Sequence, residues 1–544
     1  MRELVARVLG WWPVAIPALL AAMLHAKGFS GFWLGDDLPN LHRTHAWAQA
    51  GSLWIDTARQ FVSPITGGGS FIRPMMIATL SLNYELSGLD YAGWFALNFA
   101  VHVANVGLVA CIVLLLARRL ACDGRTAAMA AALLFGLSPV IAEGVYWVSA
   151  RSDGWVTLLS LASVALWLRE GTRHGAWIFP ILLAIALGFK ESAAVLPFQV
   201  ALVALAWPGS RPRGMGASIV AGLAIVALYF AYRAALFGAP FATYVADPAH
   251  DAQWWGRGVE AVLSLGPWAV ANAGSYPGHA AAHGALLVAS LGLGLAACRG
   301  PRLRLATAFL CAGGGQLAAT LVNLGRLAPS GEGGRLLYEP MAWIAIGIGL
   351  LAARPIGEPR RAVGGVALAA LFLCASVGAV QLHATIRHVA AVQERSRELV
   401  AAIGQWAAAR KDLTMLVVPE QQGAIVSLRN AQASLVMPPL QSRGIIHLVL
   451  PTLPREIAVR YDQFAGGLAT RLAKIVPKDV DAATLRALQA PDVALWPEAA
   501  CWSPGERRIM ALGRADPAAR DTWIRKTRAA ALACLPDDPA LREP

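Results

Sequence analysis

Long apolar runs alternate with short polar loops over the first 380 residues of this 544-residue chain. About 20 apolar residues in a helix are enough to cross the ~30 Å hydrocarbon core of a bilayer. By that measure the pattern predicts eleven membrane spans, several of them short. The predicted spans are 8–27, 93–117, 127–146, 154–169, 176–190, 193–208, 217–237, 281–298, 305–324, 337–353 and 362–380.

The composition favours membrane spans and argues against a large soluble core. The chain is 57% hydrophobic and 15% charged, whereas a soluble globular chain is about 45–50% apolar and about 25% charged. The net charge is +13. Because the basic residues sit in short loops between apolar runs, we interpret them as orientation signals and expect no nucleic-acid partner.

The first apolar run has two interpretations, a cleaved signal peptide or a retained span. The run from Val5 to Ala26 is long for a signal core, and no clean small-x-small site follows it. We therefore predict a retained first span.

The arginines of the short loops predict the orientation of the chain. Loops expected in the cytoplasm hold Arg118, Arg119, Arg125, Arg169, Arg173, Arg211, Arg213, Arg299, Arg302, Arg304, Arg354, Arg360 and Arg361. The alternate loops hold Asp36, Asp37, Asp56, Glu143, Asp153, Asp247 and Asp251, with fewer cations. The alternation requires that 258–276, which contains Gly266-Pro267, is interfacial or re-entrant. We expect an integral protein of a bacterial inner membrane, with a cytoplasmic N-terminus and a periplasmic C-terminal domain.

The pattern changes after residue 380. Residues 381–410 predict a helix that leaves the last span, and strands are expected at 415–418, 424–428 and 445–450. Helical patterns follow at 482–488 and 522–532. The predicted fold class is thus an α-helical polytopic membrane domain at 1–380, with a small extracytoplasmic α/β domain at 381–544. Cys501 and Cys534 would be able to pair outside the cytoplasm, but spacing alone does not show that they are close.

The first outer loop, 28–92, carries the adjacent carboxylates Asp36 and Asp37 directly after an aromatic stretch. Adjacent carboxylates raise each other's cost of ionisation. One of them, aimed at an acceptor hydroxyl, would act as a general base. The alternative is a helix N-cap and a solvated loop acid.

Polar residues also occur in and beside the next spans. Arg73-Pro74 predicts the start of an amphipathic helix. Asn98, His102 and Asn105 are spaced four and three apart and therefore share one helix face. Such groups usually face the interior of a bundle. The alternative for His102 is a purely structural hydrogen bond between helices.

Further acids and cations gather in the segments predicted at the outer face. They are Glu143, Arg151, Asp153, Lys190, Glu191, Glu332, Arg335, Tyr338 and Glu339. Arg151, Lys190 and Arg335 are suited to hold a phosphate at the depth of the lipid headgroups. Alternatively, each cation only extends from a helix end toward water.

Taken together, these segments resemble the GT-C superfamily of membrane glycosyltransferases. The resemblance is to the branch of the protein O-mannosyltransferases, the transmembrane O-mannosyltransferases with TPR repeats and the aminoarabinose transferases. The matching segments run from residue 28 to about 340. They are Asp36-Asp37, Phe71–Pro74 with Leu82-Asn83-Tyr84 and Gly88, His102 with Asn105, SPVIAEGVYWVSARSD, Lys190-Glu191 and Arg335-x-x-Tyr338-x-Pro340.

The resemblance implies transfer of a sugar from a polyprenyl-phosphate donor, outside the cytoplasm and with inversion. It implies Asp36 or Asp37 as base and Arg151 as leading phosphate ligand, with Lys190 and Arg335 second. The implied acceptor is a glycan, lipid or protein hydroxyl in the cell envelope.

The chain departs from the family pattern at Ser138 and Gly144, and it shows neither a TPR array nor a β-trefoil. Some members use Mg²⁺ or Mn²⁺ at the loop acid, and oxygens of Asp36, Asp37 and Glu143 would suit such an ion.

Three other functions are compatible with parts of the pattern. A lipid-glycan flippase or transporter would explain polar groups in spans, but we find no internal repeat. An O-antigen ligase would use outer arginines without needing the early acidic pair. A non-catalytic membrane scaffold would use the outer domain to bind a partner.

Overall fold

The computed structural model describes twelve stretches of the chain. They are residues 11–34, 36–63, 71–168, 175–209, 214–238, 277–324, 333–355, 361–408, 414–419, 457–462, 498–503 and 508–514. The chain divides into two compact units. Unit 1 comprises Met1–Ser30 and Ala50–His388, and unit 2 comprises Gly31–Gln49 and Val389–Pro544.

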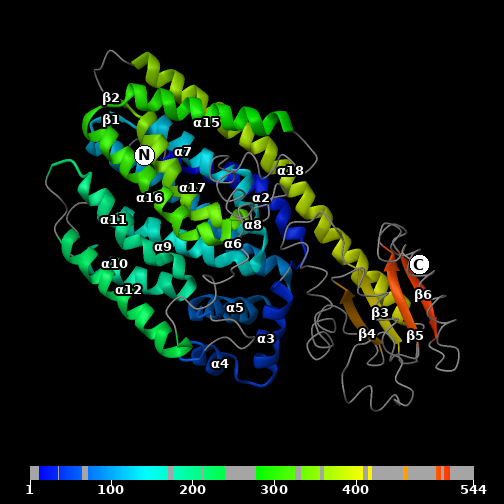
Figure 1. The fold of residues 1–544 in the computed structure, drawn as a ribbon. Coiled ribbons are helices and arrows are strands. Elements are labelled where there is room, and N and C mark those ends of the chain that lie inside the picture. The colour runs from blue at the N-terminus through cyan, green and yellow to red at the C-terminus, as the bar shows by residue number, and fades with distance from the viewer. Residues whose placement is uncertain are drawn as a thin grey trace, which may run out of the picture. The chain divides into compact units, whose positions relative to one another are not determined.

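Unit 1 is helical in its described residues, apart from one short β bridge (Figure 1). Its helices are α2 (Trp12–His25), η1 (Ala26–Ser30), α4 (Leu53–Arg59), α5 (Pro74–Ser87), α6 (Tyr91–Arg119), α7 (Arg125–Gly136), η2 (Pro139–Ile141), α8 (Ala142–Tyr146), η3 (Val148–Ala150), α9 (Arg151–Leu168), α10 (Gly175–Phe189), η4 (Glu191–Val195), α11 (Leu196–Leu205), α12 (Met215–Phe237), α15 (Pro277–Ala297), α16 (Gly300–Leu324), η5 (Gly334–Leu337), α17 (Tyr338–Ala352) and the first part of α18 (Arg361–Ala408).

Several of these helices are long and apolar enough to cross a bilayer. Among the described residues five qualify, at Trp12–Ser30, Tyr91–Arg119, Met215–Phe237, Gly334–Ala352 and Gly365–Ala408. A sixth results if α7 and Pro139–Tyr146, bent by 48°, form one span. These helices indicate an integral membrane protein. Each of the eleven predicted ranges overlaps a helix or this bent pair, but the number of crossings stays a prediction.

Local sequence signals set the bounds of the helices around the first outer loop. α5 begins with Pro74, as predicted, because proline suits the first helical position. It ends at Ser87 and is capped by Gly88, which has a φ of 54°. α6 begins after Asp90, whose side chain accepts a hydrogen bond from the Ala92 amide at 3.2 Å. Arg118 and Arg119 lie in its last turn, where cations oppose the negative end of the helix dipole.

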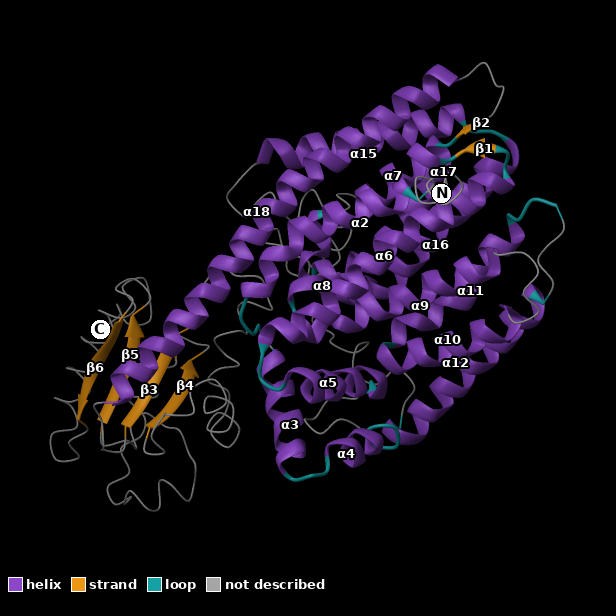
Figure 2. Cartoon of the chain, turned by 180° about the vertical axis from the view of Figure 1, so that it is seen from behind, coloured by secondary structure: helices purple, strands orange, loops and turns teal. Residues whose placement is uncertain are grey.

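Helix α17 is the centre of unit 1. Every one of its residues is buried, and it contacts α6, α7, α9, α15 and α16. By contrast, α12 buries only five residues, which is typical of a peripheral, lipid-facing helix. α10, α11 and α12 lie side by side in both views (Figure 1, Figure 2).

Loops assigned by the sequence to the cytoplasm contact one another. β1 (Cys122–Asp123) pairs antiparallel with β2 (Arg354–Pro355) and joins two of these loops. Arg302 donates a hydrogen bond to the Ala353 carbonyl, and the Arg119 guanidinium lies 5.3 Å from the Trp207 ring centroid. Four predicted cytoplasmic loops therefore meet at one end of unit 1, while the side of the membrane on which they lie stays a prediction.

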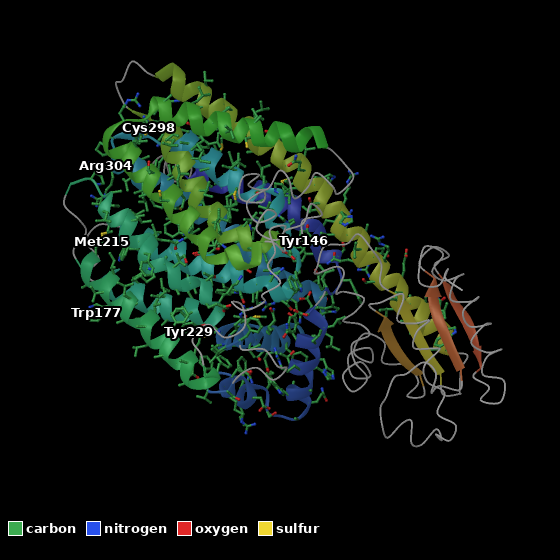
Figure 3. The ribbon with its side chains drawn as sticks, viewed as in Figure 1. Tyr146, Trp177, Met215, Tyr229, Cys298 and Arg304 are labelled. Carbon is green, nitrogen blue, oxygen red and sulfur yellow. The ribbon has the colours of Figure 1, made fainter. Side chains whose placement is uncertain are left out.

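The labelled side chains of Figure 3 follow the same grouping. Trp177, Met215, Cys298 and Arg304, which adjoin predicted cytoplasmic loops, lie along one edge of unit 1. Tyr146, from a segment predicted at the outer face, lies away from that edge (Figure 3).

Unit 2 contains α3 (Asp37–Gln49), the last part of α18 and a four-stranded sheet. Its strands are β3 (Thr414–Pro419), β4 (Ile457–Asp462), β5 (Glu498–Ser503) and β6 (Arg508–Arg514), in the order β4-β3-β5-β6. β3 is parallel to β4 and β5, and β6 is antiparallel to β5. The predicted strand at 415–418 lies within β3, and the helix predicted to leave the last span is the continuation of α18.

Other predictions for the C-terminal region lie outside the described residues. These are the strands at 424–428 and 445–450, the helices at 482–488 and 522–532, and the pairing of Cys501 with Cys534.

The packing of α16 against α17 provides a test of the fold. A Cβ at Gly313 would lie 2.7 Å from Ile344 Cγ1 and 3.0 Å from the Pro340 carbonyl, whereas one at Gly314 would meet nothing within 4 Å. We predict that Gly313→Ala destabilises the protein by about 1–3 kcal/mol through overpacking. Gly314→Ala should be neutral or slightly stabilising because alanine is the better helix former. Thermal unfolding in detergent measures both, and equal melting temperatures would contradict the α16–α17 packing.

Candidate functional site

Three ion pairs join residues from segments that the sequence assigns to the outer face. They are Arg73–Glu191 at 3.2 Å, Lys190–Asp153 at 2.5 Å and Arg335–Glu143 at 2.8 Å. Each pair links two elements that are distant in sequence, and none of the six side chains is more than 21% exposed. The structure thus pairs three of the predicted acids of unit 1, Glu143, Asp153 and Glu191, with cations.

Lys190 connects α10 to η4, Glu191 is the first residue of η4, and each binds a different element. Lys190 binds Asp153 in the first turn of α9. Glu191 binds Arg73, the residue before α5. These two contacts tie the start of α5 and the start of α9 to the same short connection.

The Glu143 carboxylate is held by Arg335 through both of its oxygens. Oε1 accepts from the Arg335 guanidinium at 2.8 Å, and Oε2 accepts from the Arg335 backbone amide at 3.1 Å. The guanidinium also lies 4.6 Å from the Trp147 ring centroid. The Glu143 side chain is 1% exposed, but Arg335 keeps 19% of its side chain accessible, so this cation can meet a ligand while it stays paired.

The polar face of α6 makes hydrogen bonds to α17 and to the segment around α9. His102 Nδ1 and the Tyr338 hydroxyl are 2.7 Å apart. The Asn105 amide donates to the Gly154 carbonyl at 2.9 Å, and the Asn98 amide donates to the Trp147 carbonyl at 3.2 Å. The predicted sharing of one face is confirmed. For His102, the sequence allowed either a functional role or a purely structural hydrogen bond between helices. The observed contact with Tyr338 is a hydrogen bond between helices.

Sequence reasoning missed a second group of polar residues around Glu339. Its Oε1 accepts a hydrogen bond from the Ser160 hydroxyl at 3.2 Å, and its Oε2 accepts from the Gln316 amide at 2.6 Å. Gln316 also donates to the Ser192 carbonyl at 3.4 Å. A signal was present, because Ser160 and Gln316 are polar residues inside apolar runs, where such groups usually have a specific partner.

Arg151 is buried, with 1% of its surface exposed. Its guanidinium donates to the Val148 carbonyl at 3.1 Å and to the Thr79 carbonyl of α5 at 3.1 Å. It also lies 5.7 Å from the Trp94 ring centroid. These contacts make Arg151 a link between α5 and α9. Of the four cations Arg73, Arg151, Lys190 and Arg335, the other three keep part of the side chain accessible.

The two acids of the first outer loop belong to unit 2 and have different surroundings. Asp36 is exposed, whereas Asp37 is 1% exposed. The Asp37 carboxylate accepts a hydrogen bond from the Leu34 amide at 3.0 Å, and the Asp37 amide donates to the Leu34 carbonyl at 3.0 Å. Asp37 therefore closes a turn at the start of α3, while Asp36 is an exposed residue beside it.

The basic residues of α3 differ in charge at neutral pH. Burial, with a smaller contribution from His45, lowers the pKa of His42, so its imidazole is neutral at pH 7. Burial lowers the pKa of Arg43 to about 10, and this residue stays charged. Arg43 donates to the Asn40 side chain at 2.6 Å and lies over the Trp47 ring.

The acids named for a divalent ion do not form a metal site among the described residues. No group of three or more His, Cys, Asp or Glu there has a suitable arrangement. Asp37 is bound to a backbone amide, and both Glu143 oxygens are occupied by Arg335. Because the oxygens of Glu143 and the carboxylate of Asp37 are engaged in these bonds, the residues present do not fit the ion.

Comparisons with known proteins give a distant structural likeness. No protein-family model matches the chain, and no curated protein matches it. A cryo-EM structure of the arabinofuranosyltransferase AftD from Mycobacteria is similar at 16% identity and a TM-score of 0.41, over 97% of this chain and 37% of that chain. A structure of a mutant of that enzyme is similar at 15% identity and a TM-score of 0.41, over 92% and 37%. The chain spans little more than a third of the length of these proteins.

The Arg335–Glu143 pair generates a stability prediction. Arg335→Ala leaves the buried Glu143 carboxylate without its guanidinium, and breaking a buried pair in this way costs about 3–5 kcal/mol. Arg59→Ala is the matched control, because Arg59 also pairs with an acid, Asp56, but is 67% exposed. Its loss should cost at most about 1 kcal/mol. Equal melting temperatures of the two variants in detergent would show that the Glu143 pair is not structural.

Proposed function

We propose that the chain is a membrane glycosyltransferase that moves a sugar from a polyprenyl-phosphate donor to an acceptor hydroxyl at the outer face of the membrane. One observation carries the proposal. The segments that resemble the GT-C enzymes lie far apart in the sequence, yet their polar residues in unit 1 bind one another, as in Arg73–Glu191 and His102–Tyr338. Polar side chains are costly in an apolar bundle, and a connected set of them favours a functional site.

The reaction is a single displacement. The acceptor oxygen forms a bond to the anomeric carbon, the bond from that carbon to the phosphate oxygen breaks, and the phosphate leaves with the electron pair. The configuration at the anomeric carbon inverts. Because the leaving phosphate is already a stable anion, the protein must mainly orient the acceptor, accept its proton and neutralise the phosphate.

Asp36 is the leading candidate for the base. An ordinary aspartate is ionised at neutral pH, and Asp36 is an exposed residue, unlike Asp37. Asp37 is the second candidate. The hydrogen bond from the Leu34 amide to Asp37 also stabilises the turn that contains Asp36.

Lys190 and Arg335 are the leading candidates for phosphate ligands, with Arg73 beside them. All three keep part of the side chain accessible while paired with a carboxylate. An arriving phosphate can be bound by a cation whose position an acid already fixes. Arg151 stays a candidate, placed second because its guanidinium already binds two backbone carbonyls.

A flippase or a scaffold would behave differently in a turnover assay. A flippase moves a polyprenyl-phosphate sugar across the bilayer without transferring the sugar, and a scaffold does neither. Purified protein in proteoliposomes, given a radiolabelled polyprenyl-phosphate sugar and a mixture of envelope acceptors, separates the three.

Neutralising the proposed base should remove activity and leave the fold intact. We expect Asp36→Asn to lower the transfer rate by about 10²–10⁴-fold, the usual contribution of a general base. Asp90→Asn is the control, since Asp90 is an exposed acid of the same loop whose capping role asparagine also performs. Wild-type rates in both Asp36→Asn and Asp37→Asn would rule out a loop aspartate as base.

Removing a phosphate ligand should act on donor binding. Lys190→Gln should weaken donor affinity by about tenfold, or about 1.4 kcal/mol, measured by titration with a polyprenyl-phosphate sugar. Asp153→Asn breaks the same ion pair but keeps the cation, so donor affinity should be retained. An equal loss in both variants would mean that the ion pair, and not Lys190 itself, supports binding.

A further inference from the structure

We propose that Gln393 and Arg397 of α18 are positioning residues for catalysis. They would hold the part of the first outer loop that runs from Gly31 to Asp37, called the acidic segment below. The proposal rests on the proposed function for its catalytic meaning. Its structural part lies wholly within unit 2, which contains both Gly31–Gln49 and the last part of α18.

Two side chains of α18 bind consecutive backbone carbonyls of the acidic segment. The Gln393 amide donates to the Phe32 carbonyl at 2.8 Å, and the Arg397 guanidinium donates to the Gly31 carbonyl at 2.9 Å. The donors are four residues apart and so lie on the same face of the helix. The guanidinium also lies 6.0 Å from the Phe32 ring centroid. The helix therefore holds the chain at two neighbouring peptide groups, which fixes its direction as well as its position.

Buried residues and hydrogen bonds connect Phe32 to the aspartates. Trp33 and Leu34 follow directly and are 3% and 1% exposed. Leu34 exchanges two hydrogen bonds with Asp37, one through its amide and one through its carbonyl, both at 3.0 Å. A shift at Phe32 would pass through this buried stretch to Asp37 and to the adjacent Asp36.

The two donors differ in burial, which makes their effects separable. Gln393 is 2% exposed, so its loss would leave the part-buried Phe32 carbonyl without that donor, which is costly. Arg397 keeps 44% of its side chain accessible and also pairs with Glu394. A change at Arg397 should disturb the acidic segment without threatening the fold.

Neither residue needs to touch substrate for this role. A general base must lie within hydrogen-bond reach of the proton that it accepts, and a misplacement of about 1 Å can cost about 100-fold in rate. Through these two hydrogen bonds to the acidic segment, the last part of α18 would determine the position of the base.

Three variants test the proposal in the full-length protein. Gln393→Glu keeps the size of the side chain but replaces the donor by an acceptor that faces the Phe32 carbonyl. Arg397→Gln removes the guanidinium, and Arg397→Lys keeps a cation that can donate one hydrogen bond. Arg395→Gln is the matched control, because Arg395 is an exposed arginine two residues away on the same helix.

Two readouts are needed, one of them independent of activity. Hydrogen–deuterium exchange of the peptide covering 31–38 should be faster in Gln393→Glu and Arg397→Gln, and unchanged in Arg395→Gln. In the transferase assay, kcat should fall by up to about 100-fold while the KM for the polyprenyl-phosphate sugar stays constant. Arg397→Lys should recover part of the kcat.

Each outcome has a meaning. Faster exchange together with lower kcat at constant KM supports the proposal. Unchanged exchange in both Gln393→Glu and Arg397→Gln overturns it, whatever the rate. Faster exchange with unchanged kcat overturns the catalytic meaning. If the Asp36→Asn and Asp37→Asn variants keep wild-type rates, the base assignment fails instead, and the exchange experiment still reports on the grip itself.

Discussion

The pairing of charges inside an apolar bundle is the constraint on which the rest of this structure depends. An isolated charge in low dielectric is costly, so a buried acid or cation must find a partner or hydrogen bonds. Here, Glu143 uses both oxygens for Arg335. Lys190 pairs with Asp153 and Arg73 pairs with Glu191 for the same reason. Because the partners come from different elements, these pairs also fix how the ends of the helices meet.

Helix α17 combines packing and chemistry. Its small residues let α16 approach closely, since a Cβ at Gly347 would lie 2.9 Å from Leu310 Cγ and 3.0 Å from the Ala306 carbonyl. Its first turn carries Tyr338 and Glu339, which bind His102 of α6 and Ser160 of α9. A helix buried on all sides is a rigid support, and polar groups at its end are positioned more tightly than groups on a loop.

The acidic segment depends on a different support. Gly31–Gln49 belongs to the same unit as the end of α18, which grips it at Gly31 and Phe32. The proposed base is thereby attached to the C-terminal part of the chain, although it lies near the N-terminus in sequence. A C-terminal unit that also selected the acceptor would bring the acceptor and its base together.

The helices of the apolar runs could be predicted from the residues alone, because hydrophobic length and helix-end signals are local, and α5 begins at the predicted Pro74. One strand could also be predicted in this way, since β3 contains the predicted 415–418. The sequence also predicted one shared polar face on α6, which follows from helical periodicity. Which charges pair could not be predicted from local patterns and followed from tertiary packing, since Arg335 and Glu143 are 192 residues apart. Tertiary packing likewise buried Arg151 and Asp37 and exposed Asp36, because burial depends on what packs around a residue and not on its neighbours in sequence.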